Sequence, residues 1–366
     1  MRILRNHILH EYCESLVFTL FLILFAFLLG RGLVQMADLI FNKQVDMILI
    51  LKLLYYSLPF ILIFVIPMAV LLTTLLIFGK LSLDNEIMAM RASGVSLYHI
   101  AKPLLVVVFL LCLVSFELSD KVASVSHFES RKLMRQIGMQ TPTAALEEGT
   151  FIKKFKNFVI FIYEIDKNEL KGVRIYQPQD GRPTRTIVAQ RGEVVTVPSE
   201  GLIKLRLING TSDEPDPKDP SKLYKLNFKT YDLPLNISEM GKIEELGKKP
   251  KDMTIRELRA EIRRLGKEGI KATFQLSAEI HNKYAMAFSS FAFLLIGIPL
   301  GITTRRSEKS VNFGIALALM TLYWVLLLAG KGIAQKGLMP PFIALQLSNF
   351  VIGGLGLVLF TRLSRK

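Results

Sequence analysis

The residues that come closest to a metal-binding pattern lie near the start of the chain. His7, His10, Glu11 and Glu14 share one face of a predicted helix, at a spacing that metal ligands use. A helix that lies at the membrane interface carries the same one-sided polar pattern, and this is the interpretation that we favour. We therefore assign no metal site to the chain.

Isolated basic residues beside apolar runs are stronger candidates for ligand binding. Arg31 interrupts an apolar segment, where a charge without a partner costs ~2.5 kcal/mol or more at the bilayer centre. Lys331 lies at the outer end of another apolar segment, and Arg131 and Arg135 lie just beyond a third. Phosphate groups of an anionic lipid would be suitable partners for these cations. Snorkelling to ordinary headgroups explains each of them at least as well.

Catalytic chemistry finds no support in the sequence. No convergent set of His, Asp and Ser or Cys indicates an enzyme that acts on lipids. The chain lacks G-x-x-x-x-G-K-[ST], the loop whose backbone cradles nucleotide phosphates, so we expect no ATP hydrolysis by this chain alone. The alternative function is a secondary transporter or another lipid-handling membrane protein not coupled to an ATPase. A secondary transporter would be expected to show internal repeats and broken midplane helices with ionisable groups, which we do not find.

The composition divides the 366 residues into apolar segments and a polar middle region. Hydrophobic residues make up 51% of the chain and the mean hydropathy is +0.38, yet 21% of the residues are charged. The apolar residues cluster from Leu16 to Lys121 and from Ala285 to Arg362, which leaves a polar, basic middle. The net charge of +15 would suit nucleic acid in a soluble protein. Because Lys and Arg gather at the ends of apolar runs, anionic headgroups are the better partners, and we expect no nucleic acid.

Six segments are apolar and long enough to cross a bilayer as helices, because ~20 helical residues span ~30 Å of hydrocarbon. Pro59 and Pro67 predict a kink in the second segment, which is the longest. The predicted spans are Ser15–Ala37, Leu49–Phe78, His99–Ser119, Ala285–Ile302, Phe313–Ala334 and Phe342–Phe360.

Basic residues in the short loops predict the orientation of these spans. An even number of spans puts both termini on one side, and that side also holds most of the loop Lys and Arg. We therefore expect the termini in the cytoplasm and the polar middle on the outer face, which in a bacterium is the periplasm. The terminal side holds Arg2, Arg5, Lys80, Arg91, Lys102, Arg305, Arg306, Lys309, Arg362, Arg365 and Lys366, and the opposite side holds Lys43, Lys52, Lys331 and Lys336.

The polar middle predicts an antiparallel β-sandwich or jelly-roll domain. From Thr150 to Leu235 the residues alternate with period two, as in Ile203–Leu207 and Tyr224–Phe228, which is typical of half-buried strands. Asp180-Gly181 and Asn209-Gly210 are the predicted turns.

One strand and two helices of this middle region have distinctive patterns. Phe158–Tyr163 is apolar on both faces, which fits a central strand covered on both sides or an open sandwich whose inner face receives lipid chains. Val122–Met134 is expected to continue the third span outward, and Thr254–Leu265 to form an amphipathic helix capped by Asp252. The predicted domains are spans one to three (1–121), the β domain with its flanking helices (122–275) and spans four to six (276–366).

The loop between the second and third spans predicts a short amphipathic helix over about residues 82–93. Ser82 is a suitable N-cap, Glu86 and Met90 share one face, and Gly94 can end the helix in the left-handed conformation. Such a helix on the cytoplasmic surface suits the docking of a soluble partner. A solvated connecting helix explains it equally well.

A set of short motifs extends along nearly the whole chain. They are Ile66-Pro67-Met-Ala-Val-Leu-Leu, Gly79-Lys80-Leu81, Glu86 with Arg91-Ala92-Ser93-Gly94, Gly192 after Ala189-Gln190-Arg191, Glu279-Ile-His281-Asn-Lys283, Gly297-Ile-Pro299-Leu-Gly301 and Pro340-Pro341. Together with the order of spans, the set resembles the lipopolysaccharide-export ABC transporter permeases of the LptF/LptG type. Glu86–Gly94 is its most specific part. The surroundings of that stretch and Thr143–Phe151 look more like LptF than LptG.

The resemblance implies a transport subunit of the bacterial inner membrane. A second permease of the same type, a cytoplasmic ATPase dimer that carries ATP and Mg²⁺, a periplasmic jelly-roll bridge protein and lipopolysaccharide are the implied partners, and the chain itself binds no cofactor. The helix at 82–93 is then the coupling helix seated in a groove of the ATPase, and lipid A phosphates are the partners of the basic residues. The expected ATPase-coupling residues are Asp84, Glu86, Met90, Arg91 and Gly94, and the expected substrate-binding residues are Arg31, Arg131, Arg135 and Lys331.

Overall fold

Among the residues that the structure describes, six helices are long and apolar enough to cross a membrane, as the sequence predicts. The computed structural model describes residues 2–33, 45–140, 148–155, 158–166, 169–179, 182–197, 202–215, 223–235, 247–267, 273–304 and 309–365. The chain divides into two compact units. One is a helical unit of residues 1–32, 54–129 and 248–366, and the other consists of residues 33–53 and 130–247 and contains the sheet.

The helices follow the apolar segments and extend several of them. Their bounds are α1 (Arg2–Phe27), η1 (Leu28–Leu33), α3 (Met47–Leu83), α4 (Glu86–Ala92), α5 (Leu97–Glu117), η3 (Leu118–Val122), α6 (Ala123–Gln140), η7 (Pro250–Asp252), α7 (Ile255–Lys267), α8 (Thr273–Thr303), α9 (Lys309–Gln335) and α10 (Pro341–Arg365).

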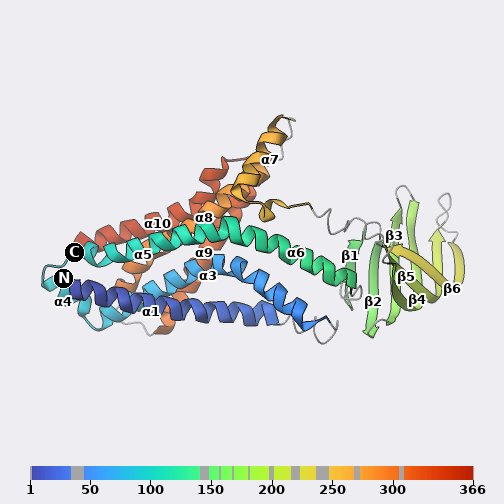
Figure 1. Cartoon of the computed structure of the whole chain (residues 1–366), viewed down its shortest axis with the longest axis horizontal. Helices are drawn as coiled ribbons and strands as arrows, with labels where there is room; N and C mark the ends of the chain where they lie inside the picture. The colour runs from blue at the N-terminus through green and yellow to red at the C-terminus, as the bar shows by residue number, and fades with distance from the viewer. Residues whose placement is uncertain are drawn as a thin grey trace. The chain divides into compact units, whose positions relative to one another are not determined.

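The third span is longer than predicted because its helix does not stop at Ser119. The π-helical turn η3 joins α5 to α6, so that helix continues from Leu97 to Gln140 (Figure 1). The predicted helical continuation over Val122–Met134 is therefore confirmed. A π-helical turn inside a longer helix frequently marks a functional site.

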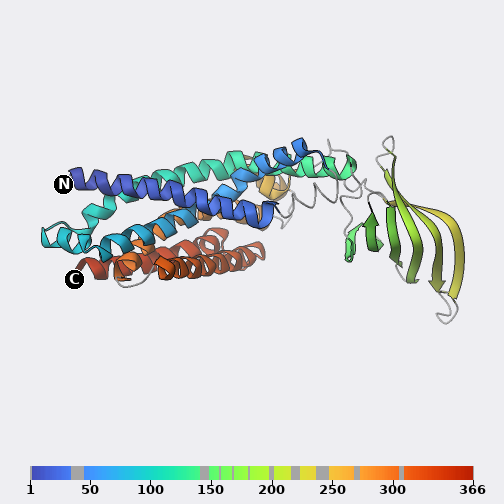
Figure 2. The same ribbon diagram turned by 90° about the horizontal axis from the view of Figure 1, so that it is seen from below.

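One end of the helical unit gathers the start of α1, the whole of α4 and the end of α10 (Figures 1 and 2). Tyr12 of α1, Ile87 and Met90 of α4 and Phe360 of α10 belong to one buried apolar cluster there. The short amphipathic helix α4 is thus fixed to the ends of the spans by its buried side, which carries Ile87 and Met90.

Close packing of α8 on α3 forms the centre of the helical unit. A Cβ atom added to Gly297 would lie 2.8 Å from Thr74 Cγ2, and one added to Gly301 would lie 2.9 Å from Phe78 Cβ. Only glycine lets the two helices approach so closely. The helix continues through Pro299 to Thr303, so this pair of glycines is a packing seam inside α8.

The second unit contains one six-stranded antiparallel sheet in the order β1-β2-β3-β4-β5-β6. Figure 2 shows the strands side by side in chain order. The inserted antiparallel β domain is therefore confirmed, and the described strands form a single sheet with consecutive connections. Their bounds are β1 (Phe151–Phe155), β2 (Phe158–Asp166), β3 (Glu169–Gln179), β4 (Arg182–Val197), β5 (Leu202–Pro215) and β6 (Leu223–Leu235).

Burial in the sheet follows the predicted alternation except at its last strand. Leu205 and Leu207 are buried, as predicted for β5. In β6, however, the side chains of Tyr224 and Leu226 are 64% and 56% exposed, so the prediction of a half-buried strand is wrong for the first half of β6. The physical reason is position, because β6 is the edge strand of the sheet formed by the described strands and pairs there with β5.

Two further expectations for the sheet are corrected. Asn209-Gly210 is not a turn between strands, because it lies inside β5, where Asn209 takes the left-handed conformation (φ 52°) and pairing continues on both sides. For β2, the alternative of a central strand fully covered on both faces is corrected, since Ile160 and Ile162 are fully buried whereas Val159 and Phe161 are half-buried and Tyr163 is 55% exposed. Asp180-Gly181 lies outside the described residues.

The amphipathic helix α7 is confirmed, but its cap is not Asp252. Glu257 accepts a hydrogen bond from the Thr254 amide (2.8 Å), and the Glu257 amide donates to Thr254 Oγ1 (3.3 Å), which is a capping box. Asp252 instead accepts from the Lys249 amide (2.8 Å) and is fully buried against His127.

Candidate functional site

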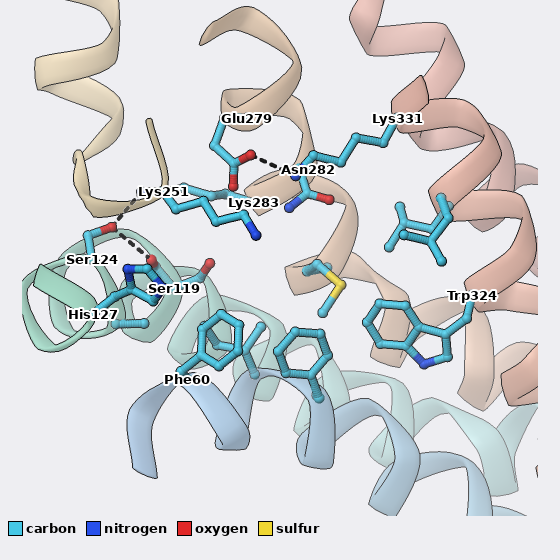
Figure 3. A pocket seen from close by; sticks show the side chains of 16 residues that line it. Phe60, Ser119, Ser124, His127, Lys251, Glu279, Asn282, Lys283, Trp324 and Lys331 are labelled. Carbon is cyan, nitrogen blue, oxygen red and sulfur yellow. Dashed lines mark hydrogen bonds and ion pairs between the residues drawn. The ribbon is translucent and has the colours of Figure 1, made fainter. Parts of the chain in front are cut away.

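A cavity of about 250 Å³ opens inside the helical unit (Figure 3). Its apolar side is made mainly by α3, α8 and α9, and its polar side by η3, α6, η7, the first turns of α8 and Lys331 of α9. The apolar lining residues are Phe60, Ile63, Phe64, Ala123, Met286, Trp324, Leu327 and Leu328, and the polar ones are Ser119, Ser124, His127, Lys251, Glu279, Asn282, Lys283 and Lys331.

An ion pair between α8 and α9 forms one corner of the cavity. Lys331 Nζ lies 2.7 Å from Glu279 Oε2, and the two side chains are 18% and 10% exposed. In Figure 3 both side chains extend toward one another at the cavity edge. The predicted lipid-binding cation therefore already has a counterion within the chain, so a lipid phosphate would have to share or displace Glu279.

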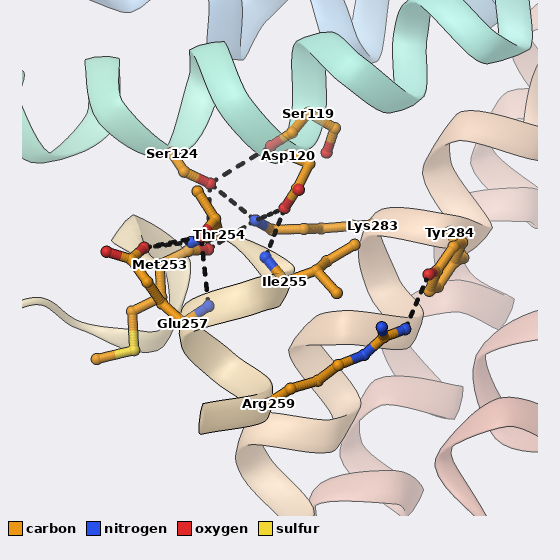
Figure 4. Close-up of polar contacts among 10 residues, drawn as sticks. All are labelled: Ser119, Asp120, Ser124, Met253, Thr254, Ile255, Glu257, Arg259, Lys283 and Tyr284. Carbon is orange, nitrogen blue, oxygen red and sulfur yellow. Dashed lines mark hydrogen bonds and ion pairs between the residues drawn. The ribbon is translucent and has the colours of Figure 1, made fainter. Parts of the chain in front are cut away.

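A second buried cation, Lys283 of α8, is held on the other side of the cavity. Its Nζ donates to Asp120 Oδ1 (3.1 Å), Ser124 Oγ (2.8 Å) and the Met253 carbonyl (2.7 Å), and the side chain is 5% exposed (Figure 4). Asp120 also accepts a hydrogen bond from the Ile255 amide (2.6 Å). Because all three ammonium protons have acceptors, Lys283 links η3, α6 and the segment before α7.

The cavity combines an apolar wall with a cationic rim. Lys331 is paired with Glu279 and Lys283 with Asp120, so Lys251 gives this set of described residues one positive charge in excess. Its volume is below the ~300–1,000 Å³ of pockets that enclose a whole small ligand. The arrangement suits part of an anionic amphiphile, with an acyl segment against the aromatic wall and a phosphate at the rim.

The α4 segment presents its polar residues outward. Asp84 and Glu86 are exposed and Arg91 is partly exposed, whereas Met90 is buried with Ile87 in the cluster that fixes α4 to the spans. Gly94 has φ +82°, the left-handed value expected at the end of this helix. Met90 therefore anchors α4 and does not lie on its exposed face.

The helix α4 starts one turn later than the sequence pattern suggests. Ser82 belongs to α3, and its hydroxyl donates to the Ile302 carbonyl of α8 (2.9 Å). Asn85, in the left-handed conformation (φ 58°), precedes the first residue of α4 and makes no side-chain capping hydrogen bond. The predicted Ser82 cap is therefore wrong, because α3 packs on α8 and the Ser82 hydroxyl donates its hydrogen bond to α8.

The remaining predicted substrate residues belong to other segments of the chain. The backbone of Arg31 lies in η1, and its side chain lies outside the described residues. Arg131 and Arg135 are partly buried one turn apart on α6, in the unit that holds the sheet. Arg135 Nε is buried without a hydrogen-bond partner among the described residues.

The polar residues near the start of the chain have partners within the helical unit. Glu11 accepts from Lys80 Nζ of α3 at 2.6 Å, and His10 lies 3.3 Å from Glu14 one turn away. Within the described ranges, no group of three or more His, Cys, Asp and Glu is arranged to hold a metal ion. The Lys80 bridge gives Glu11 a structural role at the end of α3.

Sequence reasoning missed Asp120, Glu279 and Lys283 as members of a site. The sequence did offer one signal. A charged side chain beside an apolar segment costs free energy unless it has a partner, and this applies to Glu279 and Lys283 as it does to Arg31. Their spacing of four residues suggests a pair within α8, but each finds its partner on another element. Only the packing of α8 against η3 and α9 decides this.

Comparisons with known proteins extend over both units of the chain. A family model described as lipopolysaccharide export system permease LptF/LptG matches residues 6–362. The lipopolysaccharide export system permease protein LptF of Escherichia coli K12 is 22% identical over 363 residues, covering 98% of this chain and 94% of that protein. An uncharacterised protein of Rickettsia prowazekii is 22% identical over 289 residues, 78% of each chain. The similarity includes α4 and the sheet, and is not confined to the apolar helices.

Proposed function

Because the chain belongs to the LptF/LptG family of lipopolysaccharide export system permeases, we propose that it extracts lipopolysaccharide from the membrane under the drive of separate ATPase subunits that dock on α4. The family predicted from the sequence motifs is thereby confirmed. Its members are transport subunits, and the six apolar helices make this chain a multi-pass protein of the inner membrane.

The observation that carries the ATPase coupling is the mounting of α4. Ile87 and Met90 bury one side of this seven-residue helix in the cluster that also contains Tyr12 and Phe360. A force on the exposed side of α4 would therefore be transmitted to α1, α5 and α10, because α4 packs directly against these helices. Glu86 stands in the first turn of the exposed side, where its carboxylate can accept hydrogen bonds from a partner.

The cavity rim supports a role in handling the lipid. Lys251 and the ion pair of Lys331 with Glu279 lie beside an aromatic wall, an arrangement that suits a phosphorylated acyl lipid whose phosphate shares Lys331 with Glu279. The cavity accommodates only a segment of such a lipid, so the rest of the substrate would lie against a second permease of the same type. Extraction would then proceed as movement of the spans changes this shared space.

The remaining assignments follow the family and the charge pattern. We propose that the termini and α4 face the cytoplasm, where an ATPase dimer supplies ATP and Mg²⁺, and that the sheet faces the periplasm. There it would pass lipopolysaccharide to a jelly-roll bridge protein. The basic residues at the α4 end support this orientation through the preference of short cytoplasmic loops for Lys and Arg.

Replacement of Glu86 by Ala tests the docking of the ATPase. The chain is co-expressed with the ATPase subunit that co-purifies with the wild-type protein, and the dissociation constant of the complex is measured. Loss of one hydrogen-bonded charge at an interface costs about 2 kcal/mol or more, so we expect the constant to rise at least about tenfold.

Glu14→Ala is the matched control, because it removes an exposed carboxylate of α1 at the same end of the helical unit. This variant should bind the ATPase like the wild type. Equal ATPase association of the Glu86 and Glu14 variants would refute the docking role of α4.

A further inference from the structure

A groove of about 360 Å³ lies between α7 and the ends of two spans, apart from the cavity described above. Arg256, Arg259 and Arg263 line it from α7 at positions i, i+3 and i+7, which share one face of a helix. The opposite wall is formed by Phe116 of α5 and Tyr284 of α8, whose rings stack with centroids 5.1 Å apart. Figure 4 shows Arg259 extended from α7 to the Tyr284 hydroxyl.

The three arginines keep their positive charge available to a ligand. In the described part of the chain, no ion pair engages any of them. Arg259 Nη2 donates to Tyr284 Oη (3.3 Å) and Arg263 Nε to the Arg259 carbonyl (3.3 Å), so neutral oxygens hold these two side chains in place. The neighbouring Arg264, by contrast, pairs with Glu261 at 3.1 Å.

The carboxylate of the groove does not neutralise this charge. Asp120 is the acidic residue among the described lining residues. It already accepts from Lys283 Nζ (3.1 Å) and from the Ile255 amide (2.6 Å). A buried lysine and a backbone amide thus balance Asp120, and the groove retains a net positive charge on its α7 side.

The groove lies where both spans change from apolar to polar sequence. Apolar residues of α5 end at Phe116, directly before Glu117, and those of α8 begin at Ala285, directly after Lys283 and Tyr284. This transition is the level of the headgroups, where basic and aromatic residues are favoured. A ligand in the groove therefore sits at the membrane–water interface.

Exposed apolar side chains lead from the hydrocarbon into the groove. Phe109 and Leu113 of α5 are 47% and 45% exposed and precede Phe116 on the same helix face. Phe288 of α8 is 38% exposed and lies one turn from Tyr284. Acyl chains can follow these side chains, while a headgroup phosphate reaches the arginines.

We propose that this groove binds the headgroup phosphate of an anionic glycerophospholipid, such as phosphatidylglycerol. Guanidinium groups hold phosphate through paired charge-assisted hydrogen bonds, and Arg256, Arg259 and Arg263 offer three of them on one face. The bound lipid fixes α7 at the membrane surface. The site is separate from the Lys331 cavity, so the ligand is a resident lipid of the bilayer and not the transported one.

Native mass spectrometry of the full-length chain in its purified complex tests the site. The complex is reconstituted with phosphatidylglycerol or with zwitterionic phosphatidylcholine as the lipid probe. The wild type should retain phosphatidylglycerol in preference to phosphatidylcholine, and R256Q/R259Q/R263Q should weaken phosphatidylglycerol retention about tenfold and abolish the preference.

The control R264Q/K225Q/K229Q removes an equal number of positive charges, three, from exposed positions outside the groove. It should retain phosphatidylglycerol like the wild type. R256K/R259K/R263K keeps the charge but not the planar fork, and it should show an intermediate loss. Three results would overturn the proposal: no headgroup preference in the wild type, equal loss in the Gln triple and the control, or loss of bound lipopolysaccharide in place of phosphatidylglycerol. The ATPase association through Glu86 is measured on the same samples and should not change.

Discussion

Lys331 can stabilise the fold through its ion pair with Glu279 and can also bind a lipid phosphate. The sequence alone did not distinguish these two roles. Both side chains are largely buried, at 18% and 10% exposure, and their charged atoms lie 2.7 Å apart. Removal of one partner leaves a buried charge uncompensated, which typically costs about 3–5 kcal/mol, whereas removal of both with apolar residues of similar volume is often nearly neutral. A loss of transport after a single substitution would therefore report on folding as much as on lipid binding.

A double-mutant cycle distinguishes these contributions. We expect Lys331→Met or Glu279→Met alone to lower the free energy of unfolding by about 3 kcal/mol, and the double variant to return close to the wild type. If Lys331 also holds a lipid phosphate, the double variant should fold normally yet lose most lipid-stimulated ATPase activity in the assembled complex. Thermal unfolding and ATPase assays measure the two effects. A single Lys331 variant as stable as the wild type would show that the ion pair contributes little.

The ionisation of Glu257 controls the stability of the first turn of α7. Burial acts to raise the pKa of Glu257, but hydrogen bonds from Lys248 and Thr254 outweigh it, and the pKa of this carboxyl is lowered. A lowered pKa in the folded state means that the ionised form stabilises the fold. Its contribution is fully present above the unfolded-state pKa of ~4.3 and is lost as the pH falls through the folded-state pKa.

The first turn of α7 should therefore loosen selectively in acid. Amide hydrogen exchange at Ile255–Leu258, corrected for the intrinsic rate, should stay slow above about pH 5 and accelerate below the ordinary carboxyl pKa. Glu257→Gln should weaken this pH dependence, because Gln remains neutral throughout. Identical pH profiles for wild type and Glu257→Gln would show that another group controls the helix start.

At the scale of the whole molecule, the orientation across the membrane rests on charge distribution. The α4 end of the helical unit carries the basic ends of α1, α3 and α10. We expect Met88 of α4 and Tyr224 of β6, which are 48% and 64% exposed, to lie in different compartments. Only labelling across an intact membrane decides which side each occupies.

Cysteine accessibility measures this orientation directly. In a background with Cys13→Ser and Cys112→Ser, a Tyr224→Cys variant should react with a membrane-impermeant maleimide in intact spheroplasts. Met88→Cys should react only after permeabilisation, because the positive-inside preference keeps α4 in the cytoplasm. Labelling of both positions under the same conditions would exclude the proposed topology and, with it, ATPase drive from the opposite face.

Apolar length, hydrophobic period and local motifs were enough to predict the six spans, the inserted antiparallel β domain, the short helix before Gly94 and the family. Expectations failed where a neighbour in space decided the outcome: Ser82 donates to a carbonyl of α8 instead of capping α4, and Asn209 lies inside β5. The partners of Lys331 and Lys283 could not be predicted either, since each lies on a different helix. A buried charge is stable only beside a counterion. The sequence shows that such a counterion is required, but which residue provides it depends on how helices distant in the chain pack together.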